Sequence, residues 1–554
     1  MSGDSVAQAE ARYRTALVGI VLAGVALRLS GLNWDEGRGL HPDEGNLVRA
    51  ALSLGVEGKL IPAFHAYNDL ALWLPRLLSL PFCTTGDSAC LTLAARFMSA
   101  LLSVAAIPLA AGLARQLAGE TSGAVAGLIT ASGFAASAPL VQWAHFGTTE
   151  SALVLLVVAL WRVSALWLSR GISDVRMALW SAAILGLGFG LKTTSVIAAT
   201  IPLTALVLAG WPDAQRIKAV SLGMVLAIGF GLASTPSLFL AFSDWFAVMR
   251  FENGVVTGAI PVFWTAQFQG AAHGWYDLRQ LWSATSGAGL VLAFAGLALL
   301  PRGARRAAAP ALVFAILYAL LVFGWQAKFF RYLAPLVPVV LVLAGVGAGR
   351  LVVQSISRFV LSLALTGIGL MVLAGLDQAT VYARQDPRIA AEAKLLELSA
   401  PNAIVAVEPN DLAQTGTRTR LSLLLTESDV MPETLAGQLA KAGWIVIASR
   451  RNWAVLPRQP EAPPVICTFY ARLARSDLGF VSVFQAGREG LFGRIFVPGL
   501  AIEETRTVFD RPEVILLRNI ESLPEAELVR RLADNVAPAD CTPEALARDW
   551  RRQP

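Results

Sequence analysis

A short acidic motif near the start of the chain carries residues suited to acid–base chemistry. The segment GLHPDEGN places His41, Asp43 and Glu44 within four residues. A carboxylate can act as a general base toward an acceptor hydroxyl, because it takes the proton that the hydroxyl loses during attack. Carboxylates beside an imidazole could also hold a divalent cation, so the sequence leaves a metal open as an alternative.

Further charged and polar residues stand at the ends of apolar segments, where charge is costly and usually faces a cavity or a functional group. They are Arg28, Arg96, His145, Glu150, Lys192, Lys328 and Arg331. Fixed cations beside carboxylates suit a reaction in which negative charge develops on a departing phosphate. The alternatives are structural: the two arginines would reach lipid head groups, and His145 would end a helix.

The elements that must position these residues are membrane helices. Of the 554 residues, 55% are hydrophobic and 15% are charged, against about 25% charged in an average soluble domain. Residues 1–377 hold 41 of the 84 charges, and residues 378–554 hold 43. The sequence therefore predicts a membrane domain over 1–377 and a soluble domain over 378–554. Basic membrane loops account for the net charge of +6, so we expect no nucleic-acid partner.

About eleven apolar runs are expected to span the membrane. They cover residues 16–32, 94–114, 122–141, 151–168, 177–191, 195–209, 219–241, 281–300, 307–323, 332–349 and 359–376. With the N-terminus in the cytoplasm, every inner loop contains Arg or Lys, as the positive-inside rule requires. The first outer loop, residues 33–93 with a surface helix at 67–82, and the C-terminal domain then lie outside the plasma (inner) membrane.

The four cysteines all fall on the expected outer face. Cys83 and Cys90 close a short segment, CTTGDSAC, and Cys467 and Cys541 lie in the C-terminal domain. An oxidising compartment would pair them as two disulfides, with free thiols as the alternative. In that domain, β-like runs at 403–407, 444–448, 465–469 and 514–517 and a helical stretch at 433–442 predict a small α/β fold.

At these residues the chain resembles the lipid-carrier-dependent glycosyltransferases of the GT-C fold, specifically the prokaryotic branch of family 39, the dolichyl-phosphate-mannose protein mannosyltransferases. The shared features are Asp43-Glu44, the surface helix YNDLALWLPRLLSL, Arg96 opening the second span, an acid at Glu150, Lys192 after a small-residue span, and Arg331-Tyr332-Leu333 with Pro335 and Pro338. Two positions depart from the family: Glu150 replaces an Asp, and Tyr67-Asn68-Asp69 replaces an aromatic-Pro-Pro signature.

The resemblance implies an inverting transfer of a hexose or pentose from a polyprenyl phosphate to a hydroxyl of a lipid, glycan or protein. Asp43 would be the base, and Glu44 or Glu150 would orient the acceptor or bind a metal. We expect Lys192, Lys328, Arg331, Arg96 and Arg28 at the donor phosphate, and His41, His145 and Tyr332 at the substrate. The outer loop 242–280 adds His273 and Tyr276, which would contact the donor sugar or else belong to an interfacial aromatic belt.

Two other functions are alternatives. A transporter or lipid flippase would also contain intramembrane charges, but it predicts broken helices near the midplane and two matching halves, whereas the charges here gather at one surface. A non-catalytic assembly scaffold would present the outer domain, but it leaves the acids of the HPDE segment unexplained.

Overall fold

The computed structural model describes residues 3–210, 213–355, 357–427, 429–459, 461–497, 499–501 and 503–553. The chain forms two compact units. The helical unit comprises Met1–Asn253, His273–Trp325 and Phe330–Ala383, and the sheet unit comprises Gly254–Ala272, Gln326–Phe329 and Arg384–Pro554. The sheet unit thus includes two short segments from the first 377 residues, which the composition alone had assigned to the membrane domain.

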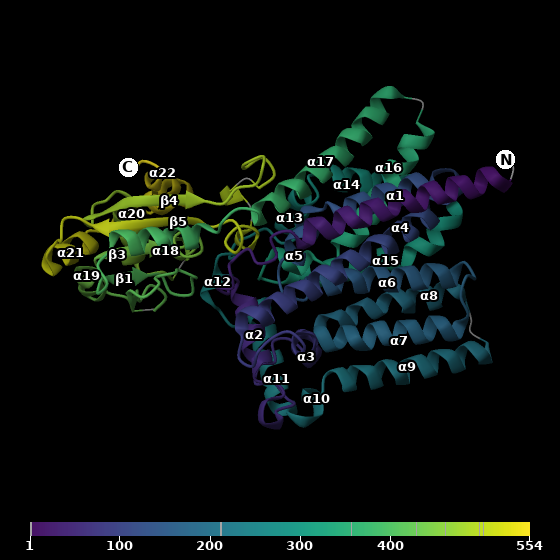
Figure 1. Cartoon of the computed structure of the whole chain (residues 1–554), viewed down its shortest axis with the longest axis horizontal. Helices are drawn as coiled ribbons and strands as arrows, with labels where there is room; N and C mark the ends of the chain where they lie inside the picture. The colour runs from purple at the N-terminus through teal and green to yellow at the C-terminus, as the bar shows by residue number, and fades with distance from the viewer. Residues whose placement is uncertain are drawn as a thin grey trace. The chain divides into compact units, whose positions relative to one another are not determined.

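The helical unit is a bundle of long apolar helices (Figure 1). It contains α1 (Gly3–Leu29), α4 (Ser88–Ala135), α6 (Glu150–Leu168), α7 (Asp174–Leu191), α8 (Thr200–Ala209), α9 (Ala214–Ser234), α14 (Ala288–Ala298), α15 (Arg302–Gly324), α16 (Val337–Gln354) and α17 (Arg358–Tyr382). Four further helices, α2 (Pro42–Leu52), α3 (Asp69–Ser79), α10 (Ser237–Leu240) and α11 (Phe242–Thr257), gather at one end of this bundle (Figure 1). The chain is a polytopic α-helical membrane protein.

Among the described residues, seven helices are long and apolar enough to cross a membrane, or eight if the bent pair α13 (Trp275–Ala284) and α14 forms one span. This is fewer than the eleven spans expected. The runs at 94–114 and 122–141 lie on either side of Gly119, where the backbone of α4 is non-helical, so α4 contains two helical segments although it counts once among the seven. Helix α1 is continuous but has Arg12 and Arg14 before its apolar part and Arg28 near its end. Residues 193–209 form only a short apolar helix.

Small residues allow the bundle helices to approach closely. A Cβ on Gly345 or Gly349 of α16 would lie within 3 Å of Thr130 or Ala126 of α4. Gly347 approaches Gly296 of α14 in the same way. Because the interhelical contact is made by backbone, these positions exclude larger side chains and fix how the helices cross.

The sheet unit contains a five-stranded sheet in the order β2-β1-β3-β5-β4. The strands are β1 (Ile404–Val407), β2 (Thr419–Ser422), β3 (Trp444–Ile447), β4 (Phe480–Gly487) and β5 (Glu513–Asn519). β1 pairs in parallel with β2 and β3, whereas β5 is antiparallel to β3 and β4. Alternating side chains pack on α18 (Pro387–Leu398) on one face, and on α19 (Pro432–Lys441), α20 (Pro464–Ala474), α21 (Glu525–Ala533) and α22 (Pro543–Trp550) on the other.

One predicted strand is wrong. Residues 465–469 belong to helix α20, whose start is set by Pro463 at the N-cap and Pro464 at the first helical position. Proline suits the first turn of a helix because the N–H it lacks would have no intrahelical partner there. A short apolar run fits a buried helix as well as a buried strand, and here the helix buries Val465, Ile466 and Phe469 on the sheet.

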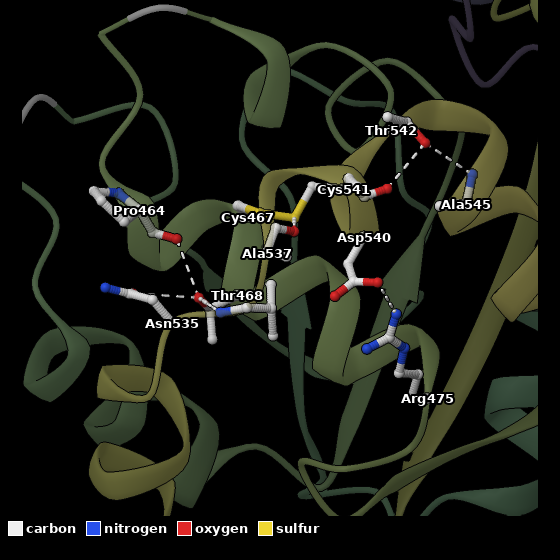
Figure 2. The surroundings of a disulfide bond; sticks show 12 residues. Pro464, Cys467, Thr468, Arg475, Asn535, Ala537, Asp540, Cys541, Thr542 and Ala545 are labelled. Carbon is white, nitrogen blue, oxygen red and sulfur yellow. Dashed lines mark hydrogen bonds and ion pairs between the residues drawn. A yellow bond between two sulfur atoms is a disulfide. The ribbon is translucent and has the colours of Figure 1, made fainter.

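Two disulfides link segments within the units. Cys83 is joined to Cys90, with Cα atoms 5.6 Å apart, between α3 and the start of α4. Cys467 of α20 is joined to Cys541, with Cα atoms 5.4 Å apart, and Figure 2 shows this bond between α20 and the segment before α22. Beside it, Arg475 pairs with Asp540 at 2.8 Å, so the same two segments are also joined by charge (Figure 2).

Candidate active site

The acidic motif forms the first turn of α2. His41 is the N-cap, and its Nδ1 accepts a hydrogen bond from the backbone N–H of Glu44 at 3.3 Å. Pro42 occupies the first helical position. Carboxylates in a first turn are favoured by the N–H groups exposed at a helix N-terminus, so the sequence HPDE both starts the helix and places Asp43 and Glu44 together.

Glu44 belongs to a buried ion cluster with Arg96 and Asp35. Arg96 donates to both oxygens of Glu44, at 2.9 and 2.7 Å, and to both oxygens of Asp35, at 2.8 and 2.9 Å. The Gly147 N–H also donates to Glu44 at 2.5 Å. Gly147 must be glycine, because an added Cβ would lie 2.7 Å from the Cβ of Ala95. The cluster therefore joins the chain between α1 and α4 to α4 itself and to the segment before α6.

The cluster contains two acids and one guanidinium, and the pKa values of its two carboxyl groups shift in opposite directions. Burial raises the pKa of Glu44, and Arg96 only partly opposes this. Burial also raises the pKa of Asp35, but Arg96 together with the N–H groups of Leu40 and Gly37 brings it below its ordinary value. Arg96 is fully buried between both acids, so it holds this loop in place and does not present itself to a donor phosphate.

Asp43 has a different environment from its neighbour. Its side chain is 22% exposed and pairs with Arg331, which is 25% exposed. Arg331 lies in the short helix η3 (Phe330–Leu333), which is anchored by Phe330 stacking on Trp143 with ring centroids 5.2 Å apart. A long-range contact thus places a partly accessible carboxylate beside a partly accessible guanidinium.

A second acid–base pair is formed by Glu150 and Lys192. Glu150 begins α6 and is 2% exposed, and its Oε1 lies 3.8 Å from Nζ of Lys192. This is an ion pair without a hydrogen bond, and Oε1 has no hydrogen-bond partner among the described residues. Lys192 follows α7, is 19% exposed, and lies 5.5 Å from the centre of the Tyr67 ring.

Tyrosines and a further acid surround this second pair. Burial raises the pKa of Tyr67, and the nearby groups of Glu150, Tyr332 and Glu252 raise it further. Burial raises the pKa of Glu252, while Lys192 opposes that shift. Tyr332 directly follows Arg331, so both acid–cation pairs border the same group of residues.

The start of the surface helix α3 is held in place by Asn68 and Asp69. The Asn68 side chain donates to the carbonyl of Phe189 at 2.5 Å and accepts from the indole N–H of Trp245 at 2.9 Å. Asp69 accepts two hydrogen bonds at 2.7 Å, from the backbone and the hydroxyl of Ser237. These residues hold α3 against the segments around Lys192, a role that hydropathy alone does not reveal.

Other candidate residues have structural partners. Arg28 is fully buried and donates to Ser103 and to the carbonyls of Gly24, Phe134 and Ala135, which ties α1 to α4. The His145 ring is buried, stacks on Tyr382 at 3.6 Å, and bonds the carbonyls of Val141 and Ser30. Arg28 thus packs inside the protein instead of reaching lipid head groups, whereas His145 ends helix α5 (Ala138–Ala144), as its structural alternative had it.

The remaining candidates lie elsewhere. His273 is exposed and its Nδ1 contacts the carbonyl of Phe323 at 3.2 Å, and Tyr276 lies in the first turn of α13. Lys328 is buried and belongs to the sheet unit.

Among the described residues, no three His, Cys, Asp or Glu side chains come close enough to hold a metal ion. The site also contains Asp35, Tyr67 and Glu252, which the sequence analysis did not name as site residues. Only their positions beside the expected outer segments could have suggested them.

No family model matches the chain, and no curated protein matches it. Among solved structures, the apo oligosaccharyltransferase of Archaeoglobus fulgidus is 13% identical with a TM-score of 0.50, over 83% of this chain and 72% of that one. ArnT of Cupriavidus metallidurans bound to undecaprenyl phosphate is 14% identical with a TM-score of 0.48, over 92% and 98%. The arabinofuranosyltransferase AftD from Mycobacteria is 15% identical with a TM-score of 0.35, over 92% and 42%. The oligosaccharyltransferase shares the fold, which confirms the expected GT-C architecture.

Proposed function

We propose that the protein is a glycosyltransferase that takes a monosaccharide from a polyprenyl-phosphate carrier and transfers it, with inversion, to a hydroxyl of a lipid, glycan or protein acceptor. The observation that carries the proposal is the Asp43–Arg331 pair, a partly exposed carboxylate held beside a partly exposed guanidinium in a membrane protein. The fold shared with an oligosaccharyltransferase supports it.

Asp43 acts as the general base in this proposal. The acceptor O–H passes its proton to the Asp43 carboxylate while the oxygen attacks the anomeric carbon on the side opposite the phosphate. The bond between that carbon and the phosphate oxygen breaks, and the polyprenyl phosphate leaves with the bonding electron pair. One displacement of this kind inverts the configuration at the anomeric carbon.

Arg331 and Lys192 stabilise the departing phosphate. A guanidinium has five N–H donors, so Arg331 can contact Asp43 and a phosphate oxygen together. Lys192 is held only loosely by Glu150, because their 3.8 Å separation is too long for a hydrogen bond. Positive groups fixed in advance around the leaving group lower the barrier without having to reorganise during the reaction.

Glu150 orients the acceptor hydroxyl. Both oxygens of Glu44 are occupied by Arg96, whereas Oε1 of Glu150 has no hydrogen-bond partner among the described residues. Of the two acids considered for this role, Glu150 is therefore the one that can accept a hydrogen bond from a substrate hydroxyl. We expect Glu150→Gln to raise the KM for the acceptor more than the KM for the donor.

The test is sugar transfer by the full-length protein in detergent. The protein is given a panel of polyprenyl-phosphate monosaccharides and membrane extract as the acceptor source, and release of polyprenyl phosphate is measured. We expect release with one donor class, and a fall of about 100-fold to 10,000-fold in Asp43→Asn. The exposed Asp244→Asn, in the first turn of α11, is the matched control and should keep wild-type activity.

Each result has one meaning. Full activity in Asp43→Asn would remove Asp43 as the base while leaving the enzyme class in place. No release from any donor by a folded preparation would reject the glycosyltransferase and favour the transporter or scaffold alternatives. Lys192→Met should raise the donor KM, and an unchanged donor KM would remove Lys192 from the phosphate site.

A further inference from the structure

The sheet unit contains a cleft at the edge where its parallel strands end. Arg450 and Trp453 follow β3, and Arg488 follows β4. The antiparallel pairing of β5 with both strands places Glu513, the first residue of β5, opposite Gly487, the last residue of β4. The carboxyl edge of parallel strands is the common place for ligands to bind in α/β sheets.

Positive charge exceeds negative charge in this cleft. Its lining contains five arginines, Arg450, Arg488, Arg494, Arg511 and Arg551, and two acids, Glu489 and Glu513. Both acids pair with the same arginine, Arg494. Asp386 contacts Arg488 at 3.4 Å, but it is shared with Arg388, which it contacts at 2.8 Å. Glu504 interacts electrostatically with Arg450 from outside the lining. Among the residues that line the cleft, arginines outnumber acids.

Two side chains offer N–H groups to a ligand. Trp453 is 3% exposed and lines the cleft, and its indole N–H has no hydrogen-bond partner among the described residues. A buried donor without an acceptor costs free energy, which an oxygen atom of a ligand would recover. Arg551, which directly follows α22 and lines the cleft, uses Nε to donate to the carbonyl of Ala547 at 2.9 Å, and its guanidinium has further N–H groups besides this one.

We propose that this cleft binds an anionic carbohydrate, a sugar that carries a carboxylate or a phosphate. Guanidinium and indole groups are donors only, so they select oxyanions over neutral or cationic groups. As the docking site for the acceptor of the transfer reaction, the cleft rests on the proposed function. That the cleft binds anionic sugars does not depend on the proposed function, because the binding residues lie in the sheet unit and include neither Asp43 nor Arg331.

The experiment is a calorimetric titration of the full-length protein in detergent with four probes: glucuronic acid, glucose 6-phosphate, inorganic phosphate and glucose. We expect the anionic sugars to bind more weakly as salt rises, and glucose not to bind. Equal binding of both anionic sugars would identify the oxyanion as the recognised group. Binding of glucose 6-phosphate and phosphate alone would restrict the ligand to phosphate, and binding of glucuronic acid alone would restrict it to carboxylate.

Single substitutions distinguish binding in the cleft from attraction to positive charge elsewhere on the protein. Arg551→Ala should weaken binding about tenfold, because it removes charge-assisted hydrogen bonds from an exposed residue whose loss leaves the fold intact. Arg552→Ala is the matched control, since Arg552 is exposed and does not line the cleft. Trp453→Phe should weaken binding while keeping an aromatic ring of similar shape. Equal losses in the two arginine variants, or no binding of any anion by the wild type, would overturn the proposal.

The Asp43→Asn variant distinguishes the two proposals. It should bind the anionic sugars as the wild type does, even though it lacks transfer activity. If the wild type binds these sugars but releases polyprenyl phosphate from no donor, the cleft stands and the transferase fails. If transfer proceeds while no anionic sugar binds, the transferase stands and the cleft fails.

Discussion

Asp43 and Glu44 are neighbours in sequence but have different partners. Successive side chains on a helix point about 100° apart, so the two carboxylates of α2 face different surroundings. Glu44 is buried against Arg96 and Asp35, and Asp43 is partly exposed against Arg331. The buried acid fixes the first turn of α2, and this leaves the exposed acid in a defined position for chemistry.

Arg96→Met should destabilise the protein by about 3–5 kcal/mol, because it leaves Asp35 and Glu44 buried without their cation. Thermal unfolding of the full-length protein in detergent measures the effect. Arg49→Met is the control, since Arg49 is exposed on α2, where its guanidinium donates to Asn46. An unchanged melting temperature in Arg96→Met would show that the cluster does not stabilise the fold.

Glu504 should make the stability of the sheet unit depend on pH. Burial raises its pKa to about 7, with Arg451 opposing the shift and Glu503 adding to it. A carboxyl group whose folded pKa exceeds its unfolded value near 4.5 binds its proton more tightly in the folded state. Its stabilising contribution is therefore full below about pH 4.5 and is lost as the pH rises through about 7, an effect of up to about 3 kcal/mol.

Unfolding followed by tryptophan fluorescence at several values between pH 5 and pH 8 checks this. The wild type should lose stability as the pH rises, and Glu504→Gln should lose less over the same range. Parallel pH profiles for the two proteins would show that Glu504 does not titrate in this window. Glu461→Gln, in a turn before α20, gives a control for removing an exposed acid.

At the scale of elements, the close contact of α16 with α4 depends on glycine. An added Cβ at Gly345 would lie 1.9 Å from the hydroxyl oxygen of Thr130, whereas one at Gly369 of α17 would have no atom within 4 Å. The first position sits inside an interhelical contact and the second faces open space. The same substitution should therefore destabilise the protein at the first position and be tolerated at the second.

Gly345→Val should separate α16 from α4 and lower the melting temperature and the yield of folded protein in detergent. Gly369→Val, the same change on a bundle helix, should be close to neutral. Overpacking usually costs about 1–3 kcal/mol, and more when the neighbour is backbone that cannot move. Equal stability of the two variants would rule out the close contact.

The two disulfides should differ in their contribution to stability. Cys83 and Cys90 are 7 residues apart, and Cys467 and Cys541 are 74 apart. In the chain-entropy model, closing the shorter loop contributes about 2.5 kcal/mol and closing the longer one about 4.5 kcal/mol. The double variant Cys467→Ser with Cys541→Ser should lower the melting temperature more than Cys83→Ser with Cys90→Ser.

Thiol labelling of the unfolded wild type checks the bonds themselves. All four cysteines should react only after reduction, and complete labelling without a reductant would contradict both pairs. Arg475 and Asp540 also join the segments around the second disulfide (Figure 2). The Asp540→Asn variant therefore tests how far charge alone holds this part of the sheet unit.

At the scale of the whole molecule, the chain combines a membrane bundle with a sheet unit that also holds residues 254–272 and 326–329. The second of these segments ends directly before η3, the helix that carries Arg331. The sheet unit is thus connected through the backbone to a residue of the proposed site. From the Lys and Arg in the expected inner loops, we expect the N-terminus in the cytoplasm and the sheet unit outside.

Proteolysis of sealed right-side-out vesicles tests this orientation. An added protease should remove a C-terminal epitope tag and leave an N-terminal tag intact. Opening the vesicles with detergent should make both tags accessible, which is the control. Protection of the C-terminal tag in sealed vesicles would place the sheet unit in the cytoplasm and would reject the external reaction.

Local patterns in the sequence determined where most elements lie. Long apolar runs predict membrane helices because unpaired backbone groups are too costly in lipid, and helical segments occur at the expected positions, including the two that meet at Gly119 of α4. The signal was weaker in the sheet unit, where the short run at 465–469 fits a helix or a strand and proved to be α20.

The amino-acid sequence by itself determined the bundle, the C-terminal sheet unit and the acidic turn of α2, because periodicity, composition and helix capping act over a few residues. Only the tertiary structure decided which charges pair. Arg96 meets Asp35 61 residues away, and Arg331 meets Asp43 288 residues away. An isolated Arg or Asp looks the same in sequence whether it ends up buried or accessible, since its partner is chosen by packing between distant helices.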